Sequence, residues 1–346
     1  MDIAYFRQEV IVVLFIENHS CFMQIINSLG ADFQEYLSQY RWKKKPQNLY
    51  EPSEYILQLG GKRMRPILVL MATEALGGNR SMAMHAALAV EFFHNFTLVH
   101  DDIMDAAPLR RKSPTVHSRW GNNVAILSGD VLFAKSLACL EAYPPHSYKS
   151  LTKLLIQTAI EVCEGQQMDM DFEQQKEVLM ADYIEMIRLK TAVLVGAAMQ
   201  MGALVAEKNE SVQKQLYDFG IQLGIAFQLQ DDYLDTFGDA KTFGKQIGGD
   251  ILENKKTYLF IKALENAVPE QRAALLALYA DNGLFPDKKI REVQEIFVET
   301  QAEQFLLEEI KQYTQRALRA LKEADLPSGS KEIFEHFAFE LMHRRT

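Results

Sequence analysis

Residues 92–105 read FFHNFTLVHDDIMD, an apolar run that ends in the acidic cluster DDIMD. Residues 221–235 repeat this design, because the run IQLGIAFQLQ leads into a second cluster, DDYLD. Neither stretch alternates polar and apolar residues as a half-buried strand does, whereas an apolar run of this length fits a helix. We therefore expect each acidic cluster to follow a long helical run.

The rest of the chain has the same character. Helix-favouring Ala, Leu, Met, Glu, Gln and Lys dominate the long segments, and apolar residues recur three or four positions apart. Segments of more than about 20 residues with few polar positions are typical of helices inside a large bundle. No linker rich in Pro, Gly and Ser divides the 346 residues, so we expect one all-α domain, a single-domain bundle of long helices. The candidate helices cover approximately residues 24–41, 51–58, 64–76, 80–105, 122–142, 148–173, 181–203, 208–236, 254–266, 270–281, 287–323 and 330–343.

The N-terminal segment is set apart from this domain. Met23 offers an alternative start, so we treat residues 1–22 as an N-terminal extension and residues 23–346 as the helical domain. The apolar run at residues 10–16 is too short to span a bilayer, so we expect no stable membrane insertion. It also lacks the basic region and the small-residue cleavage site of a signal peptide. Three cysteines without zinc spacing suit a reducing compartment, and we expect the cytoplasm. The net charge of −9 argues against a nucleic-acid partner.

Three aspartates make up each acidic cluster: Asp101, Asp102 and Asp105 in the first, and Asp231, Asp232 and Asp235 in the second. On a helix the first and fifth positions of such a cluster lie on one face, one turn apart. Like charges this close repel each other unless a cation lies among them, and oxygen ligands favour a hard cation such as Mg²⁺. A single acidic cluster is more often a solvated helix end. Two copies, 130 positions apart, favour a metal site.

Cations and polar residues flank both clusters, in the order Lys62, Arg65, Arg110, Arg111, Lys190, Thr191, Gln228, Lys245 and Lys255. Lys62 and Arg65 lie in the segment GGKRMRP, where glycines allow the backbone to approach a ligand closely. A basic loop between helices is usually just solvated, but Lys190 interrupts an otherwise apolar helix. The combination suggests a layered site, in which carboxylates hold metals, metals hold a diphosphate, and the cations hold its outer oxygens.

These motifs resemble those of the trans-isoprenyl diphosphate synthases, which include farnesyl and geranylgeranyl diphosphate synthases. The matching segments are GGKRMRP (60–66), HNFTLVHDDIMD (94–105), RR (110–111), GQQMD (165–169), KT (190–191), FQLQDDYLD (227–235) and GKQIGGDILENKKT (244–257). The resemblance implies an all-α bundle around a deep central cavity, usually as a homodimer. It also implies three Mg²⁺ ions that bridge the two clusters through an allylic diphosphate, with isopentenyl diphosphate as the second substrate.

The resemblance also assigns roles to individual residues. The metal ligands would be Asp101, Asp105 and Asp231, with Asp102, Asp232 and Asp235 as supporting or water-mediated partners. The residues that hold the allylic diphosphate would be Arg110, Lys190, Lys245 and Lys255, helped by Thr191, Gln228 and Asp250. Those for isopentenyl diphosphate would be Lys62, Arg65, His94 and Arg111, with the C-terminal Arg344 and Arg345. The residues expected to carry the reaction itself are Asp101, Asp102, Asp105, Arg110, Lys190, Gln228, Asp231 and Lys245. One departure is Lys112, where the family usually has glycine.

Product length is expected to depend on Phe96 and Thr97, the fifth and fourth positions before the first cluster. In the resembled family, bulk at these positions limits the product. One aromatic residue without a second beside it favours a C20 product, geranylgeranyl diphosphate, with C15 next. The alternative is that Phe96 is an ordinary core residue.

Three other classes of protein compete with this interpretation. A class I terpene cyclase would share the first cluster, but it would normally replace the second DDxxD and needs no second diphosphate pocket. A non-catalytic subunit of a prenyl synthase would be expected to have lost part of a cluster. A di-iron carboxylate bundle could use the E-x-x-H spacing of Glu91 and His94, but it needs a second such motif on a partner helix.

Overall fold

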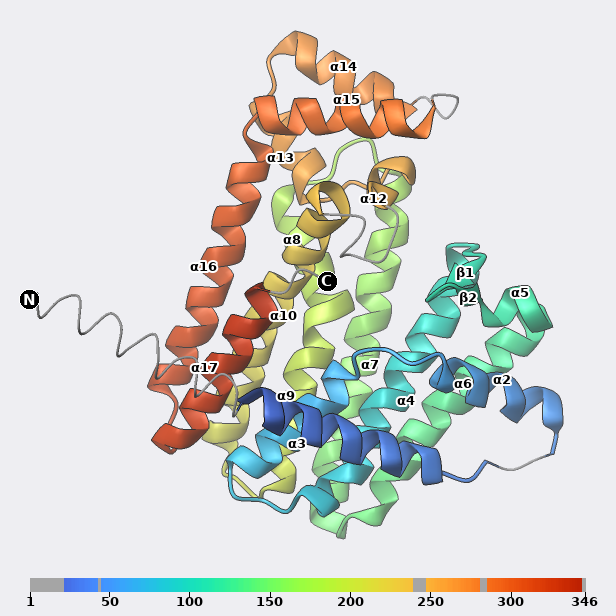
Figure 1. The fold of residues 1–346 in the computed structure, drawn as a ribbon, viewed down its shortest axis with the longest axis vertical. Coiled ribbons are helices and arrows are strands. Elements are labelled where there is room, and N and C mark those ends of the chain that lie inside the picture. Colours follow the sequence, from blue (N-terminus) through green and yellow to red (C-terminus); the bar gives the residue numbers. More distant parts are fainter. Residues whose placement is uncertain (1–21, 43–44, 239–246, 281–284, 344–346) are drawn as a thin grey trace, which may run out of the picture. The chain divides into compact units, whose positions relative to one another are not determined.

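The structure, a computed structural model, describes residues 22–42, 45–238, 247–280 and 285–343. It is helical almost throughout, which confirms the all-α fold class (Figure 1). The chain divides into two compact units, and each is described in turn.

The first unit comprises residues 1–156, 198–214 and 326–336, as far as they are described. Its elements are a helix over residues 22–39, α2 (Gln47–Gln58), α3 (Met64–Ala75), α4 (Arg80–Met104), β1 (Leu109–Arg110), β2 (Ser113–Pro114), α5 (Val116–Trp120), α6 (Asn122–Cys139), a 3-10 turn (Leu140–Ala142) and the beginning of α7 (Pro145–Gln174). Helix α4 is central, because it packs against both α3 and α6.

Helix α4 begins and ends where its sequence requires. The side chain of Asn79 caps it by accepting a hydrogen bond from the backbone N–H of Ser81 at 2.9 Å. Phe92 and Phe93 are fully buried, which stabilises the fold by about 1.5–3 kcal/mol for each ring. After the acidic cluster, Ala106 takes a left-handed conformation with φ of 50°, which ends the helix.

A short hairpin follows α4, and the sequence did not predict it. Strands β1 and β2 pair antiparallel, with Arg110 opposite Ser113. Arg111 and Lys112 form the two-residue turn with φ of 52° and 64°. Positive φ at both central positions is the geometry of a type I′ hairpin turn, which usually selects Asn-Gly. Lys112 therefore adopts the conformation that a glycine would take without strain.

The second unit comprises residues 157–197, 215–325 and 337–346, as far as they are described. Its elements are the rest of α7, α8 (Met180–Ile187), a π-helical segment (Arg188–Ala192), α12 (Gly249–Leu252), α13 (Tyr258–Asn266), α14 (Pro269–Ala280), α15 (Pro286–Glu299) and α16 (Ala302–Glu323). Three further helices have residues in both units: α9 (Val193–Val205), α10 (Glu210–Phe237) and α17 (Ser328–His343). Helices α14 and α15 lie side by side in Figure 1 and contact each other.

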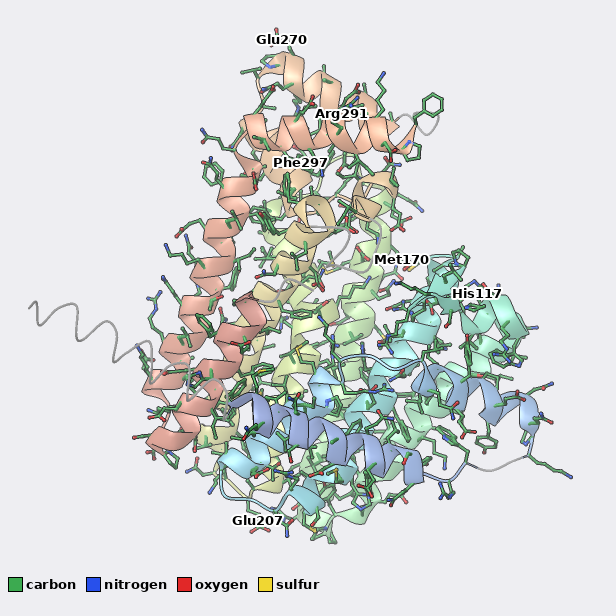
Figure 2. All side chains as sticks on the ribbon, viewed as in Figure 1. His117, Met170, Glu207, Glu270, Arg291 and Phe297 are labelled. Atoms are coloured by element: carbon green, nitrogen blue, oxygen red, sulfur yellow. The ribbon has the colours of Figure 1, made fainter. Side chains whose placement is uncertain are left out.

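The sequence predicted one helix over residues 287–323, and this is wrong in one respect. The structure has two helices, α15 and α16, because Gln301 takes a left-handed φ of 61°. The hydroxyl of Thr300 donates a hydrogen bond to the carbonyl of Ile296 at 2.7 Å at the same point. Phe297, labelled in Figure 2, is fully buried on α15. The break contains no Gly or Pro, so composition alone did not reveal it.

Two described stretches, Asn122–Ala142 and Met180–Val205, are long and apolar enough to cross a membrane by length and composition. The core helix of a soluble protein passes the same test. In Met180–Val205, 72% of the most apolar window is buried, against 33% in Asn122–Ala142. Asn122–Ala142 therefore carries an exposed apolar face.

Candidate active site

The first acidic cluster lies in the last turn of α4, at the negative end of the helix dipole, where carboxylates are unfavourable unless cations compensate them. Asp102 is only 1% exposed. Its two oxygens accept hydrogen bonds from Nε of Arg110 at 2.8 and 2.9 Å. Asp101 and Asp105 lie one turn apart and are more exposed. The cluster thus anchors its middle aspartate, and the first and fifth residues are its candidate metal ligands.

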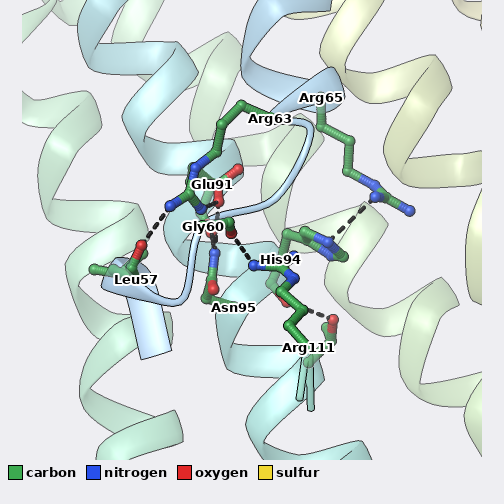
Figure 3. A network of polar contacts seen from close by, with 9 residues as sticks. Leu57, Gly60, Arg63, Arg65, Glu91, His94, Asn95 and Arg111 are labelled. Carbon is green, nitrogen blue, oxygen red and sulfur yellow. Dashed lines mark hydrogen bonds and ion pairs between the residues drawn. The ribbon is translucent and has the colours of Figure 1, made fainter. Parts of the chain in front are cut away.

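Two of the cations predicted for isopentenyl diphosphate, Arg65 and Arg111, lie around His94 in the first unit (Figure 3). Arg111, at the hairpin turn, donates a hydrogen bond to the carbonyl oxygen of Gly60. Gly61 has a φ of 120°, which favours glycine, and a Cβ there would lie 2.6 Å from the guanidinium carbon of Arg111 and would displace that guanidinium. Arg65 lies in the first turn of α3, and its Nη1 is 3.3 Å from Nε2 of His94.

His94 is a neutral partner of these cations. Because a guanidinium can only donate, Nε2 of His94 accepts the hydrogen bond from Arg65, and the ring proton resides on Nδ1. Burial lowers the pKa of His94 well below its usual value, and the positive charges of Arg65 and Arg111 add to the shift. His94 could therefore bind isopentenyl diphosphate by donating a hydrogen bond from its neutral imidazole, rather than through a positive charge.

The candidate length-determining residues lie in an aromatic cluster. The ring of Phe96 is 5.3 Å from that of Phe133 on α6 and 4.8 Å from the imidazole of His100. The hydroxyl of Thr97 donates to the backbone carbonyl of His94 at 2.8 Å and so turns back onto its own helix.

The second acidic cluster repeats the arrangement of the first. Asp232, again the middle residue, is 4% exposed. It accepts hydrogen bonds from the hydroxyl of Tyr183 and from Nε2 of Gln228, the latter at 3.2 Å. Burial raises the pKa of Asp232, and the carboxylate of Asp250 adds to this shift. Burial, reinforced by Asp232, also raises the pKa of Tyr183, so its hydroxyl keeps the proton that it donates.

Residues predicted for the allylic diphosphate line a pocket of about 120 Å³ in the second unit. Nζ of Lys190, in the π-helical segment, lies 2.6 Å from Oδ2 of Asp169. Nζ of Lys255 lies 2.7 Å from Oε2 of Glu253 and 3.8 Å from Oδ1 of Asp250. Burial lowers the pKa of Lys255, but the carboxylates of Asp250 and Glu253 more than reverse this, so the ammonium group remains charged.

Two further hydrogen bonds connect this pocket to the second cluster. The hydroxyl of Thr191 donates to Oε1 of Gln228 at 3.1 Å. The backbone N–H of Asp250 donates to Oδ2 of Asp235 at 3.0 Å. The structure therefore joins Thr191, Gln228 and Asp250 to the second cluster.

The donor set fits Mg²⁺. Within the described ranges, no three side chains of His, Cys, Asp or Glu converge closely enough to hold a metal by themselves. Mg²⁺ does not require this, because it commonly takes one or two carboxylates together with water and substrate phosphate oxygens. Asp101 and Asp105 in the first unit, and Asp231 in the second, are candidate oxygen donors of the type that Mg²⁺ prefers.

Some predicted residues are not placed, and some contributors were missed. Lys245, Arg344 and Arg345 lie outside the described residues. Asp169, the partner of Lys190, belongs to the quoted motif GQQMD but received no role from the sequence. Tyr183 gave no sequence signal, because its partner Asp232 lies 49 positions away.

Comparison with known proteins places these features in a family. The model of the polyprenyl synthetase family matches residues 46–297. A geranylgeranyl pyrophosphate synthase of Geoglobus acetivorans is 37% identical, over 93% of this chain and 98% of that protein. A geranylfarnesyl diphosphate synthase of Natronomonas pharaonis is also 37% identical, over 65% of this chain and 71% of that protein. A crystal structure of a geranylgeranyl pyrophosphate synthase has 46% identity and a TM-score of 0.89, covering 93% of this chain and 99% of that one.

Both the sequence and the structure of this chain thus match those of polyprenyl synthetases. The match agrees with its helical fold and its two DDxxD clusters. The chain belongs to the polyprenyl synthetase family. The family resemblance and the prediction of a prenyltransferase are confirmed.

Proposed function

We propose that this protein catalyses the Mg²⁺-dependent head-to-tail condensation of isopentenyl diphosphate with an allylic diphosphate and makes the C20 product, geranylgeranyl diphosphate. The observation that carries the proposal is that both DDxxD clusters are intact and each has its middle aspartate, Asp102 or Asp232, anchored by hydrogen bonds. Family membership supports the same reaction.

The allylic diphosphate is the electrophile. Asp101 and Asp105 in the first unit and Asp231 in the second would hold Mg²⁺, and by family resemblance three ions are expected. Bound Mg²⁺ would neutralise the charge that develops on the departing diphosphate. Lys190 and Lys255 bind the outer diphosphate oxygens as point charges, which favours breakage of the allylic C–O bond.

Isopentenyl diphosphate is the nucleophile. Lys62, Arg65 and Arg111 bind its diphosphate and so orient its double bond toward the allylic carbon. The π electrons form the new C–C bond, and a proton leaves the resulting cation. Released pyrophosphate is the base, so no protein nucleophile is required.

Product length is proposed to depend on Phe96. Its ring packs on Phe93 and Phe133, which restrict its movement and support a role as a fixed floor. Relatives named for geranylgeranyl and for geranylfarnesyl products both have 37% identity to this chain, the first over 93% of it and the second over 65%, so the product length is proposed from Phe96 rather than from their names.

Assembly and location complete the proposal. An exposed apolar face of α6, which includes Ile126 and Leu127, supports packing against a second copy as a homodimer. Cys139 and Cys163 form no disulfide, which supports a cytoplasmic location. The proposal includes no stable membrane insertion.

The test is chromatographic sizing of the prenyl product made from dimethylallyl and labelled isopentenyl diphosphates with Mg²⁺. We expect C20 from the native chain and a longer product from Phe96→Ala. Phe305→Ala removes an exposed ring on α16 and is the matched control, which should leave the length unchanged. Pyrophosphate release without isopentenyl diphosphate would favour a terpene cyclase, and no release at all would favour a non-catalytic subunit.

A further inference from the structure

A buried ion pair joins the loop at residues 60–65, which carries Lys62 and Arg65, to helix α4. Nη1 of Arg63 binds Oε1 of Glu91, with side-chain exposures of only 6% and 2% (Figure 3). Nη2 of Arg63 donates to the backbone carbonyl of Leu57, near the end of α2. One guanidinium therefore ties the loop to both α2 and α4.

Glu91 is itself fixed in place. Nδ2 of Asn95, one turn further along α4, donates to Oε1 of Glu91 and to its backbone carbonyl, both at 2.8 Å. Breaking a buried ion pair on one side leaves an uncompensated charge, which is strongly unfavourable. Helix α4 thus fixes the position of the Arg63 side chain through Glu91.

The backbone of Arg63 has a strained conformation that helps to set the path of the loop. Arg63 takes a left-handed conformation with φ of 48°, as the residue immediately before α3. For a residue other than glycine this conformation is unfavourable and persists only where the surroundings enforce it. The bonds to Glu91 and Leu57 are such an enforcement. The conformation sets the direction of the chain on either side of Arg63, and with it the positions of Lys62 and Arg65.

The same loop also holds the hairpin cation. Gly60 accepts a hydrogen bond from Arg111, and the missing Cβ of Gly61 makes room for its guanidinium. A shift of the loop would therefore displace Arg111 along with Lys62 and Arg65. The three cations assigned to the second diphosphate all depend on one backbone segment.

We infer that Arg63 and Glu91 are positioning residues for isopentenyl diphosphate: their buried pair fixes the loop so that Lys62, Arg65 and Arg111 face a single diphosphate. The inference rests on the proposed function. The pair acts through the loop and does not touch the substrate. It also gives Glu91 a role other than the metal ligand of an E-x-x-H motif.

The test separates the two substrates kinetically. Glu91→Gln keeps the shape of the side chain but removes the charge that holds Arg63. We expect the KM for isopentenyl diphosphate to rise about tenfold, as loss of a bond to a charged group implies, and the KM for the allylic diphosphate to stay within about twofold. Equal changes in the two KM values, or no change, overturn the inference.

A double variant separates positioning from stability. Arg63→Met with Glu91→Leu replaces the pair by apolar side chains of similar size, a change that is often neutral for folding. We expect the melting temperature to stay near that of the native chain while the KM for isopentenyl diphosphate remains raised. Recovery of a native KM in the double variant would overturn the inference. If the double variant does not fold, the ratio of the two KM values in Glu91→Gln decides.

The matched control is Arg80→Met, which removes another arginine at the start of a helix in the same unit. Arg80 pairs with Asp32 and Glu74 far from the loop, and its loss should leave both KM values unchanged. Failure of the proposed function is recognised separately, because the native chain would then not consume isopentenyl diphosphate at all.

Discussion

Asp102 and Asp232 occupy the same place in their clusters and are held in the same way. Each is almost fully buried, and each accepts hydrogen bonds from side chains within its own unit. Consecutive residues on an α-helix point about 100° apart, so the second aspartate faces inward when the first and fifth face a ligand. A buried carboxylate is stable only when it is paired, which Arg110 provides for Asp102.

The neutral state of His94 gives a pH prediction. Its pKa is depressed in the fold, so the unfolded chain binds this proton first as the pH falls. The contribution of neutral His94 to the free energy of unfolding is therefore fully present above about pH 6.5 and declines below it. At pH 5.5, one unit below, the loss is up to about 1.4 kcal/mol. Thermal unfolding at pH 7.5 and 5.5 measures it, and His94→Gln should show a smaller decline because Gln cannot protonate.

Several groups surround the imidazole and define this prediction. The cations Arg63, Arg65, Arg110 and Arg111 all disfavour its protonation. If the stability of His94→Gln declined between pH 7.5 and 5.5 as much as that of the native chain, His94 would not be the cause of the decline. The comparison is made without diphosphate, since a bound anion would itself favour the imidazolium.

The types of the site residues were predictable from sequence, but their internal partners were not. Acidic residues four positions apart on a helix can be recognised as a cluster from the sequence, because the partners are local. Glu91 and Arg63 lie 28 positions apart, and Tyr183 and Asp232 lie 49 apart. No local pattern encodes such pairs, because packing of separate helices creates them.

At the scale of elements, the π-helical segment Arg188–Ala192 carries both Lys190 and Thr191. Wider turns of this kind are rare and often occur at functional sites. Helix α7 approaches this segment at Gly165, where a Cβ would lie 2.3 Å from the backbone nitrogen of Lys190. Glycine is therefore required for the two segments to pack this closely.

Gly165→Ala should displace the π-helical segment. We expect a loss of about 1–3 kcal/mol in the free energy of unfolding, as for other overpacked sites, and a higher KM for the allylic diphosphate. Denaturant unfolding and steady-state kinetics measure the two effects.

Gly329→Ala is the control for this change. Gly329 lies in α17, and a Cβ there would meet nothing within 4 Å. It should leave the KM unchanged and keep or slightly raise stability, since Ala favours helix over Gly. Equal behaviour of the two variants would show that α7 does not hold the segment in place.

Element type was predictable over most of the described chain, because long apolar periodicity dominates it. The exceptions have no compositional signal. The break at Gln301 lacks Gly and Pro, and the hairpin turn uses Arg111 and Lys112 where Asn-Gly would be expected. Such sites are decided by tertiary contacts, which in the hairpin include the bond from Arg111 to Gly60.

At the scale of the whole molecule, a chain with a net charge of −9 is proposed to bind two highly charged anions. Local cations and bound metal must therefore overcome the overall repulsion. Inorganic pyrophosphate with Mg²⁺ should stabilise the fold, by about 2.7 kcal/mol at 100 times its dissociation constant. For a chain of 346 residues this raises the melting temperature by about 4 °C.

Differential scanning fluorimetry measures this rise. Mg²⁺ alone and pyrophosphate with a chelator are the two controls, and each should give a smaller rise. An equal rise with pyrophosphate in the presence of chelator would argue against the carboxylates as metal ligands.

The internal ion pairs also determine which anions the protein accepts. Arg110 is bound to Asp102, and Lys190 to Asp169, before any ligand arrives. A weakly charged ligand such as a monophosphate gains little by displacing these carboxylates, because each would be left without a counter-charge. In either unit, a diphosphate that arrives with divalent cations can satisfy both the cationic side chain and its carboxylate. We therefore expect each paired state to set a threshold of ligand charge, so that partly hydrolysed substrates bind more weakly than intact diphosphates whatever their hydrocarbon tails.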